Sequence, residues 1–298
     1  MSNIEKLTTE ARNPKTYKLD EMSPLEIVKV MNEEDENVIK AVRNELEDIA
    51  KAIEICTEAL ENGGRLIYMG AGTSGRLGLL DAVECPPTFG TPDDLVIGLI
   101  AGGEKAFIKA VEGAEDSTTL GEEDLKSIGA NSKDVVVGIA ASGRTPYVIY
   151  GLKYAKSIGS KTIAIACNRE SEIGKEADLA IEVVTGPEVL TGSTRLKAGT
   201  AQKMVLNMIS TGTMVGIGKV YQNLMVDVVQ TNEKLRMRAE NIVISATNCS
   251  REEAKKYLEL AGGNAKTAIV MILKNCSLEE ATERLRKSKG HIRLALLK

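Results

Sequence analysis

Two short segments of this chain carry the side chains and backbone that suit the binding of an anion. Residues 70–76 read GAGTSGR and residues 140–146 read AASGRTP, so each holds Ser-Gly-Arg among small residues. Hydroxyl groups, and backbone N–H groups at the start of a helix, are donors that proteins offer to phosphate. One such segment alone fits an ordinary helix N-cap. Two in one chain favour a single phosphate site built from both.

The surrounding hydrophobic pattern predicts what positions these two segments. Short apolar runs at 65–72, 95–103, 134–143, 162–167 and 179–185 alternate with stretches of helical spacing. This alternation is typical of an α/β domain with a parallel sheet covered by helices on both faces. Both Ser-Gly-Arg segments end a predicted strand and enter a predicted helix. Because ligands bind beyond the carboxyl ends of such strands, we expect both at one edge of the sheet.

Helix signals complete the outline. Ser23, Pro24 and Glu26 predict a helix start after an irregular polar arm at residues 1–22. Beyond residue 231 the strand pattern ends, and three or four helices are expected. The spacing of apolar residues predicts further helices over 34–62, from 74 until Pro86 and Pro87 stop it, over 106–113, over 145–159, and over the small-residue stretch 194–218.

Composition excludes several function classes. A formal net charge of -4, no Trp and only two Phe argue against nucleic-acid binding. The single histidine, His291, excludes a metal site of several histidines. Five cysteines without a CxxC pair indicate neither zinc nor disulfides. The charged N-terminal segment and the absence of a long apolar run predict no signal peptide, no membrane span and a cytoplasmic location.

Beyond these patterns, the chain resembles a known family. The paired loops are similar to those of the SIS (sugar isomerase) domain, a flavodoxin-like α/β fold that binds phosphosugars. Longer strings together resemble the N-acetylmuramic acid 6-phosphate etherase family of SIS-domain proteins. They are TEARNP (9–14), GAGTSGRLGLLDAVECPPTFG (70–90), AGGEKAF (101–107), AVEGAEDS (110–117), GIAASGRTPYV (138–148), TGSTRLKAGTAQK (191–203) and NLMVDV (223–228).

The expected organisation follows from pattern and resemblance together. We expect an N-terminal arm and helices over residues 1–55, a three-layer SIS domain over 56–230, and a small helical domain over 231–298. Residues 249–272 resemble a small three-helix fold of the ubiquitin-associated type. A homodimer is also expected, since SIS domains commonly associate and the Gly- and Ala-rich helix near 198–218 offers a face for close packing.

The resemblance implies a reaction. It is cleavage of the D-lactyl ether of N-acetylmuramic acid 6-phosphate to N-acetylglucosamine 6-phosphate and D-lactate, by elimination and hydration, in the recycling of cell-wall amino sugars. It implies neither a metal nor an organic cofactor. Two alternatives remain open: an aldose-ketose isomerase of phosphosugars, and a phosphosugar sensor without catalysis, as in glucokinase regulatory protein. Release of D-lactate distinguishes the etherase from both.

The resemblance also implies roles for particular residues. The acid of the family falls on Glu84 and its base on Glu115. A helix ending at Pro86 would place Glu84 at the negative end of the dipole and raise its pKa, as a proton donor requires. By spacing alone, Glu104, Glu112 and Asp116 compete with Glu115.

The residues expected to bind the substrate lie in the two loops and in the stretch before the helix near 198. The roles of Arg76 and Arg144 stay open among lactate binding, phosphate binding and pairing with surface acids. The expected substrate-binding residues are Thr73, Ser74, Gly75, Ser142, Gly143, Thr145, Glu188 and Ser193.

Overall fold

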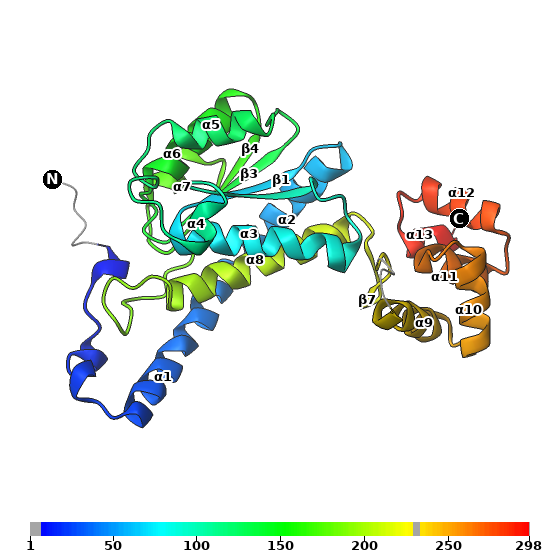
Figure 1. Ribbon diagram of the computed structural model, residues 1–298, viewed down its shortest axis with the longest axis horizontal. Helices are drawn as coiled ribbons and strands as arrows, with labels where there is room; N and C mark the ends of the chain where they lie inside the picture. Colours follow the sequence, from blue (N-terminus) through cyan, green and yellow to red (C-terminus); the bar gives the residue numbers. More distant parts are fainter. Residues whose placement is uncertain (1–6, 229–232, 298) are drawn as a thin grey trace. The chain divides into compact units, whose positions relative to one another are not determined.

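The computed structural model describes residues 7–228 and 233–297 (Figure 1). The expected domain junction at residues 230 and 231 therefore lies outside the described residues. The chain forms two compact units. We call Met1–Val83 with Asp94–Ser210 the sheet unit, and Glu84–Asp93 with Thr211–Lys298 the helical unit. Of the described helices, none is long and apolar enough to cross a membrane.

The sheet unit is built on five parallel strands in the order β2-β1-β3-β4-β5. This is the flavodoxin-like order, and it confirms the α/β fold expected from the sequence. All residues of the central strands β1 and β3 are buried, as expected where helices cover both faces. The strands are β1 (Leu66–Gly70), β2 (Val96–Ile100), β3 (Val135–Ala140), β4 (Lys161–Ala166) and β5 (Leu179–Glu182).

Helices cover the two faces of the sheet (Figure 1). One face carries α5 (Leu120–Ser127), α6 (Pro146–Ser157) and α7 (Glu172–Glu176). The opposite face carries α2 (Leu46–Glu61) and the parts of α3 (Gly72–Phe89) and α8 (Lys197–Gly216) that belong to this unit. Ala198, Ala201 and Ser210, three of the small residues of α8, are buried within this chain.

From residue 7, the first that the structure describes, to Arg43, the N-terminal region consists of three 3-10 turns and a helix. The turns are Thr8–Glu10, Pro14–Thr16 and Leu19–Glu21. Helix α1 (Pro24–Arg43) starts at the predicted cap, where the Ser23 hydroxyl accepts from Glu26 N and the Glu26 carboxylate accepts from Ser23 N. This reciprocal pair satisfies two backbone donors that a helix start leaves open.

The prediction of a single helix over 34–62 is wrong, because a turn at Asn44 and Glu45 separates α1 from α2. The break turns the Glu45 side chain inward. Its carboxylate accepts from Glu182 N of β5 at 3.3 Å and pairs with Arg169 at 2.7 Å. The Glu45 carboxylate thus gives an acceptor to a backbone N–H group of the edge strand β5, and this bond offsets the helical hydrogen bonds lost at the turn.

Two further helix boundaries differ from the prediction. Helix α3 passes through Pro86 and Pro87 and ends at Phe89, followed by Gly90 at φ +58. Proline φ is compatible with a helix, and the buried side chains of Cys85 and Phe89 hold these last turns. The helix expected over 106–113 is reduced to α4 (Lys105–Ile108). Arg76 donates to the carbonyls of Ala106 and Phe107, which a longer helix would need as acceptors.

In the helical unit, a short antiparallel hairpin, β6 (Val220–Tyr221) and β7 (Leu224–Met225), precedes five helices among the described residues. The expectation of three or four was too low, because positive φ at Lys289 and Gly290 ends α12 and starts another helix. Their core includes Val243, Ile269 and Val270, which are fully buried. The helices are α9 (Glu233–Thr247), α10 (Arg251–Leu260), α11 (Ala265–Lys274), α12 (Leu278–Lys287) and α13 (Ile292–Leu297).

Candidate functional site

The two Ser-Gly-Arg loops leave neighbouring strands of the sheet unit. Gly70 is the last residue of β1, and it lies opposite Ile139, the penultimate residue of β3. Helix α3 begins two residues after β1, and α6 begins at Pro146 after the second loop. Since β1 and β3 run parallel, both loops lie at the same edge of the sheet. The structure thus brings together the two segments that the sequence predicted to form one site.

The first loop is the opening turn of α3. Ser74 is almost buried, at 7% exposure, and its hydroxyl donates to Gln202 Oε1 of α8 across 3.0 Å. A Cβ on Gly75 would lie 2.6 Å from Gly70 O, so the strand and helix approach too closely for any side chain there. Thr73 is partly exposed at the same turn.

The second loop has a hydroxyl that is free to meet a ligand. Thr145 is the N-cap of α6, yet within the described part of the chain its side chain makes no capping bond to that helix. Ser142 accepts a bond from Arg144 N at 3.3 Å. Gly143 has φ +74, and a Cβ there would meet Ser171 Cβ at 2.4 Å. Glycine is therefore required at 143 for the shape of the loop.

Glu115 lies next to the second loop. It sits on an irregular exposed segment, and its carbonyl accepts from Tyr147 N in the first turn of α6 at 3.0 Å. Tyr147 is buried and donates through its hydroxyl to Asp124 at 2.7 Å, which fixes that turn. The backbone of Glu115 is thus held beside Thr145. Glu104, Glu112 and Asp116 are equally exposed on the same stretch of chain.

Glu84 is placed differently. It is exposed on α3, ten residues beyond Ser74 in the same helix. Because α3 continues to Phe89, Glu84 lies more than one turn before the helix end, and the helix-end argument made from Pro86 does not hold. The two loops and Glu115 belong to the sheet unit, whereas Glu84 is the first residue of the helical unit.

The start of α8 forms another wall at this edge. Glu188 is fully buried, and its two carboxylate oxygens accept from Lys197 N at 3.0 Å and Ala198 N at 2.9 Å. Burial raises the pKa of Glu188, and these two backbone donors oppose the rise only in part. Glu188 is therefore an N-terminal cap of α8. Ser193 lies in the turn that precedes this helix, partly buried.

A buried ion pair that sequence reasoning missed fixes the same helix start. Lys197, only 1% exposed, donates to Glu34 of α1 across 2.6 Å. Asn13 and Lys15 of the N-terminal arm also bond to the Glu34 carboxylate, at 2.9 and 3.0 Å. Burial raises the pKa of Glu34, but the hydrogen bonds from these partners outweigh the effect of burial and lower the pKa to about 2. Only the tertiary structure brings these four residues together, since they come from three distant parts of the sequence.

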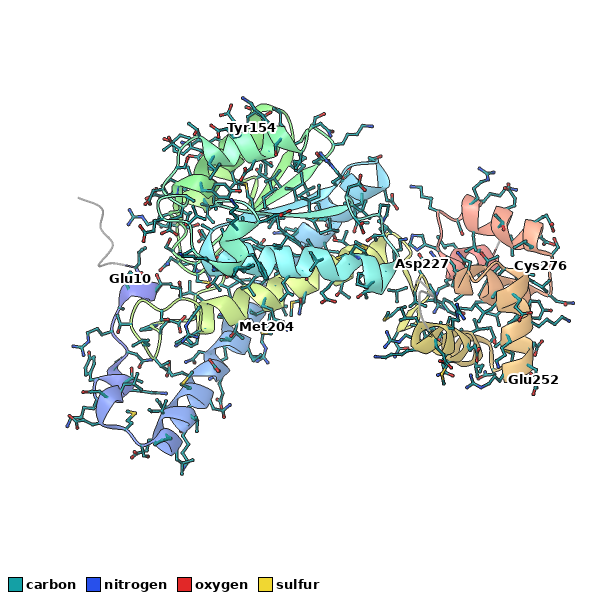
Figure 2. The ribbon with its side chains drawn as sticks, viewed as in Figure 1. Glu10, Tyr154, Met204, Asp227, Glu252 and Cys276 are labelled. Atoms are coloured by element: carbon teal, nitrogen blue, oxygen red, sulfur yellow. The ribbon has the colours of Figure 1, made fainter. Side chains whose placement is uncertain are left out.

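The N-terminal arm packs against the strand ends of its own chain. Asn168, just after β4, accepts from the Thr8 hydroxyl at 2.7 Å and donates to Thr9 and to Ala141 O. Ala141 belongs to the second loop, so the arm and that loop share one side chain. Figure 2 shows Glu10 beside the loop before α8, where a Cβ on Gly192 would lie 3.5 Å from the Glu10 carboxylate. The arm thus packs against Asn168 after β4 and against the loop before α8.

The two arginines left open by the sequence have partners. Arg76 Nε and Nη2 donate to Phe107 O at 2.8 Å and Ala106 O at 2.7 Å. Arg144 pairs with the exposed Glu172 at 2.8 Å. Arg76 therefore secures α4 against α3, and Arg144 secures the second loop against α7.

The structure also shows whether a metal ion or another ligand has a place outside the two loops. No three His, Cys, Asp or Glu side chains gather closely enough for a metal ion among residues 7–228 and 233–297. A cavity of about 840 Å³ lies in the helical unit, where Lys219 and Lys266 are among the residues that line it. Both lysines pair with Asp227, at 3.2 and 2.8 Å, and Lys266 also donates to Gly218 O. These contacts tie the β6–β7 hairpin to α11.

Comparisons with known proteins agree with this geometry. Residues 124–212 match the SIS domain family, and residues 48–156 match the glucokinase regulatory protein N-terminal SIS domain. Among solved structures, a phosphoheptose isomerase from Francisella tularensis is similar with TM-score 0.52 and 18% identity, over 65% of this chain and 100% of that one. Another from Neisseria gonorrhoeae has TM-score 0.51 and 19% identity, over 64% of this chain and 98% of that one. The fold and the paired loops define a SIS-domain protein.

Curated relatives are much more similar. A chain from Bacillus mycoides strain KBAB4, named N-acetylmuramic acid 6-phosphate etherase, is 64% identical over 91% of this chain and 92% of its own length. A second from Bacillus cereus strain Q1 has the same name, identity and coverage. This chain belongs to the N-acetylmuramic acid 6-phosphate etherase family.

Proposed function

We propose that this chain is a carbon-oxygen lyase that cleaves N-acetylmuramic acid 6-phosphate into N-acetylglucosamine 6-phosphate and D-lactate. The 64% identity to the etherases over 91% of the chain is the observation that carries the proposal. The two hydroxyl-bearing loops at neighbouring strand ends support it, since they suit a sugar bound by its phosphate. A role in recycling cell-wall amino sugars, and a cytoplasmic location, are part of the same proposal.

The sugar phosphate occupies the edge where β1 and β3 end. The first turn of α3, with Thr73, Ser74 and Gly75, supplies backbone N–H groups and hydroxyls to the phosphate oxygens. Ser142, Gly143 and Thr145 contribute from the second loop, where the uncapped Thr145 hydroxyl is a ready donor. Glu188 and Ser193 act at the start of α8. The geometry favours an indirect role for Glu188, which shapes the wall by capping the helix.

The chemistry requires one base and one acid. In the open-chain form of the sugar, the carbonyl at carbon 1 acidifies the proton on carbon 2. Glu115 removes that proton, and the electron pair of the carbon-hydrogen bond forms a double bond to carbon 3 as the bond to the lactyl oxygen breaks. Glu84 donates a proton to the departing oxygen. Glu115 then releases the carbon-2 proton to solvent and takes a proton from the water molecule whose oxygen adds to carbon 3. It returns that proton to carbon 2, while Glu84 regains its proton from solvent.

Isotope incorporation tests the reaction. The protein is incubated with N-acetylmuramic acid 6-phosphate in deuterated water enriched in oxygen-18. The expected products are D-lactate without the heavy oxygen and a sugar with deuterium at carbon 2 and oxygen-18 at carbon 3. Deuterium at carbon 2 with no lactate would indicate an isomerase instead. A sugar that binds and never changes would indicate a sensor.

Matched variants test the two glutamates. Glu84→Gln and Glu115→Gln should each slow lactate release by roughly a hundred- to ten-thousandfold, because a positioned acid or base contributes that much. Glu104→Gln and Glu112→Gln, equally exposed, serve as controls and should retain activity. Activity retained by Glu115→Gln but lost in Glu112→Gln would assign the role of base to Glu112 instead of Glu115.

A further inference from the structure

Asn168 links the N-terminal arm to the second loop through a side chain that is buried in the sheet unit. It lies two residues beyond the end of β4 and is 3% exposed. Its amide nitrogen donates to Ala141 O at 3.2 Å and to Ser142 O at 3.4 Å in the second loop, and to Thr9 Oγ1 at 3.0 Å in the arm. Its amide oxygen accepts from the Thr8 hydroxyl at 2.7 Å. Both ends of the amide are therefore in use.

The two loop carbonyls decide which way round this amide lies. Carbonyl oxygens can only accept hydrogen bonds, so the group that faces Ala141 and Ser142 must be the NH₂ group. The amide oxygen then faces the arm, where the Thr8 hydroxyl is its donor. A buried amide oxygen without a donor costs free energy, because it has lost water and gained no partner. Thr8 therefore holds Asn168 in the orientation that the two carbonyls require.

The carbonyls of the second loop matter because of the anion that this loop is proposed to bind. A carbonyl oxygen carries a partial negative charge and repels a phosphate, so it must be turned to a donor inside the protein. The carbonyls of Ala140, Ala141 and Gly143 accept from backbone N–H groups at 3.0 Å. In the part of the chain that the structure describes, no backbone group donates to the carbonyl of Ser142, and Asn168 is its donor. Asn168 thus fixes the one loop carbonyl that the backbone leaves unbonded.

We infer that Asn168 is a positioning residue of the phosphate site, and that Thr8 of the N-terminal arm acts on this site through Asn168. The inference rests on the proposed function, in which the second loop binds the phosphate of the sugar. Asn168 keeps the Ser142 carbonyl turned into the protein, so that the hydroxyl of this serine and not its carbonyl meets the anion. The arm thus raises the affinity for the sugar phosphate by fixing the shape of the loop.

Equilibrium binding of N-acetylglucosamine 6-phosphate, the product of the proposed reaction, tests the inference without turnover. Asn168→Ala should weaken this binding, measured by calorimetry, roughly 10- to 100-fold, because it removes hydrogen bonds to buried carbonyls. It should raise KM for lactate release and leave kcat unchanged, since the loss concerns binding alone. An unchanged affinity in Asn168→Ala overturns the inference.

Thr162→Val is the matched control for Asn168→Ala. Thr162 is also fully buried, and its hydroxyl donates to Asp178 at 2.9 Å near the opposite end of β4. This variant should lose stability in denaturant titration and keep its affinity for the sugar phosphate. If it loses as much affinity as Asn168→Ala, the effect of Asn168 is one of general stability and the inference is overturned.

A cycle of variants tests the arm. Thr8→Val should weaken the binding roughly 3- to 10-fold in the wild-type chain, as for one lost hydrogen bond, and no further in the Asn168→Ala chain. Thr8→Ser keeps the hydroxyl and should bind as the wild type does. Thr16→Val is the control, because the Thr16 hydroxyl lies in the same arm and bonds to Asn13 O. An effect of Thr8→Val that is absent, or that is equal in both chains, overturns the role of the arm.

These measurements separate the inference from the function on which it rests. A chain that shows the expected affinities but releases no lactate refutes the etherase reaction and supports the inference. A chain that releases lactate while its affinity is independent of Asn168 overturns the inference alone. A wild-type chain that binds no sugar phosphate overturns both. If Asn168→Ala does not fold, the comparison of Thr8→Val with Thr8→Ser decides.

Discussion

Ser74 and Gln202 are joined by a hydrogen bond that uses the single proton of the serine hydroxyl. Ser74 Oγ donates to Gln202 Oε1 across 3.0 Å, from the first turn of α3 to α8. Gln202 is 1% exposed, and its Nε2 has no partner among the described residues. Turning the amide by half a rotation would let Nε2 donate to Ser74 and release the serine proton for a phosphate oxygen.

Gln202→Glu should therefore weaken substrate binding more than Gln202→Met. A carboxylate can only accept hydrogen bonds, so the Ser74 hydroxyl must keep donating its proton to residue 202 and cannot donate to the phosphate. The carboxylate also adds a negative charge beside the phosphate. We expect KM to rise roughly 10- to 100-fold for the glutamate variant, as for a lost hydrogen bond to a charged group, and less for methionine. Steady-state kinetics and competition by inorganic phosphate measure both. Equal KM values for the two variants would refute this role of Gln202.

The Glu34–Lys197 pair predicts a loss of stability in acid. The pKa of Glu34 is lowered to about 2 in the folded chain, against an ordinary value of 4.5. The unfolded chain therefore takes up the proton first, so this contribution is complete above pH 4.5 and disappears as the pH falls toward 2. Urea unfolding should show that about 2 kcal/mol of the free energy of unfolding is lost over this window through Glu34.

Glu34→Gln should remove this part of the pH dependence. Glu33→Gln, on the exposed side of the same helix, is the matched control and should retain it. If Glu34→Gln has the same acid profile as the wild type, the buried pair does not contribute in the way described.

Glu188→Gln should destabilise the start of α8. The amide presents one NH₂ group where two backbone N–H donors, of Lys197 and Ala198, now meet carboxylate oxygens. One donor is left without an acceptor in a fully buried place, which costs about 2 kcal/mol of unfolding free energy. Denaturant titration measures the loss, with Glu172→Gln on the surface as control. An unchanged midpoint together with a raised KM would instead assign Glu188 to direct substrate contact.

Gly143→Ala should be more costly than an ordinary replacement of a left-handed glycine. At φ +74 a side chain costs about 1–2 kcal/mol by itself. The added Cβ also meets Ser171 Cβ at 2.4 Å, so the second loop must move. Gly63→Ala is the control, because Gly63 has φ +77 with nothing within 4 Å of the added atom. Thermal unfolding should show a larger loss for Gly143→Ala, by about 1 kcal/mol or more.

The sequence by itself determined the order of strands and helices and the two loops that face one edge of the sheet. Short apolar runs, caps and Ser-Gly-Arg turns are local signals, because each depends on residues near one another in the chain. The family resemblance likewise followed from contiguous strings such as GAGTSGRLGLLDAVECPPTFG. Both were confirmed by the parallel sheet and by the curated relatives.

Only the tertiary structure decided which distant side chains meet. Glu34 meets Lys197, Gln202 meets Ser74, and Asn168 joins the N-terminal arm to the second loop. Pro86 lies inside a helix because buried neighbours hold it there, and the helix at 105 stops early because Arg76 takes its carbonyls. These outcomes depend on contacts between residues far apart in sequence, whose free energy outweighs local preference and leaves no local pattern to be read.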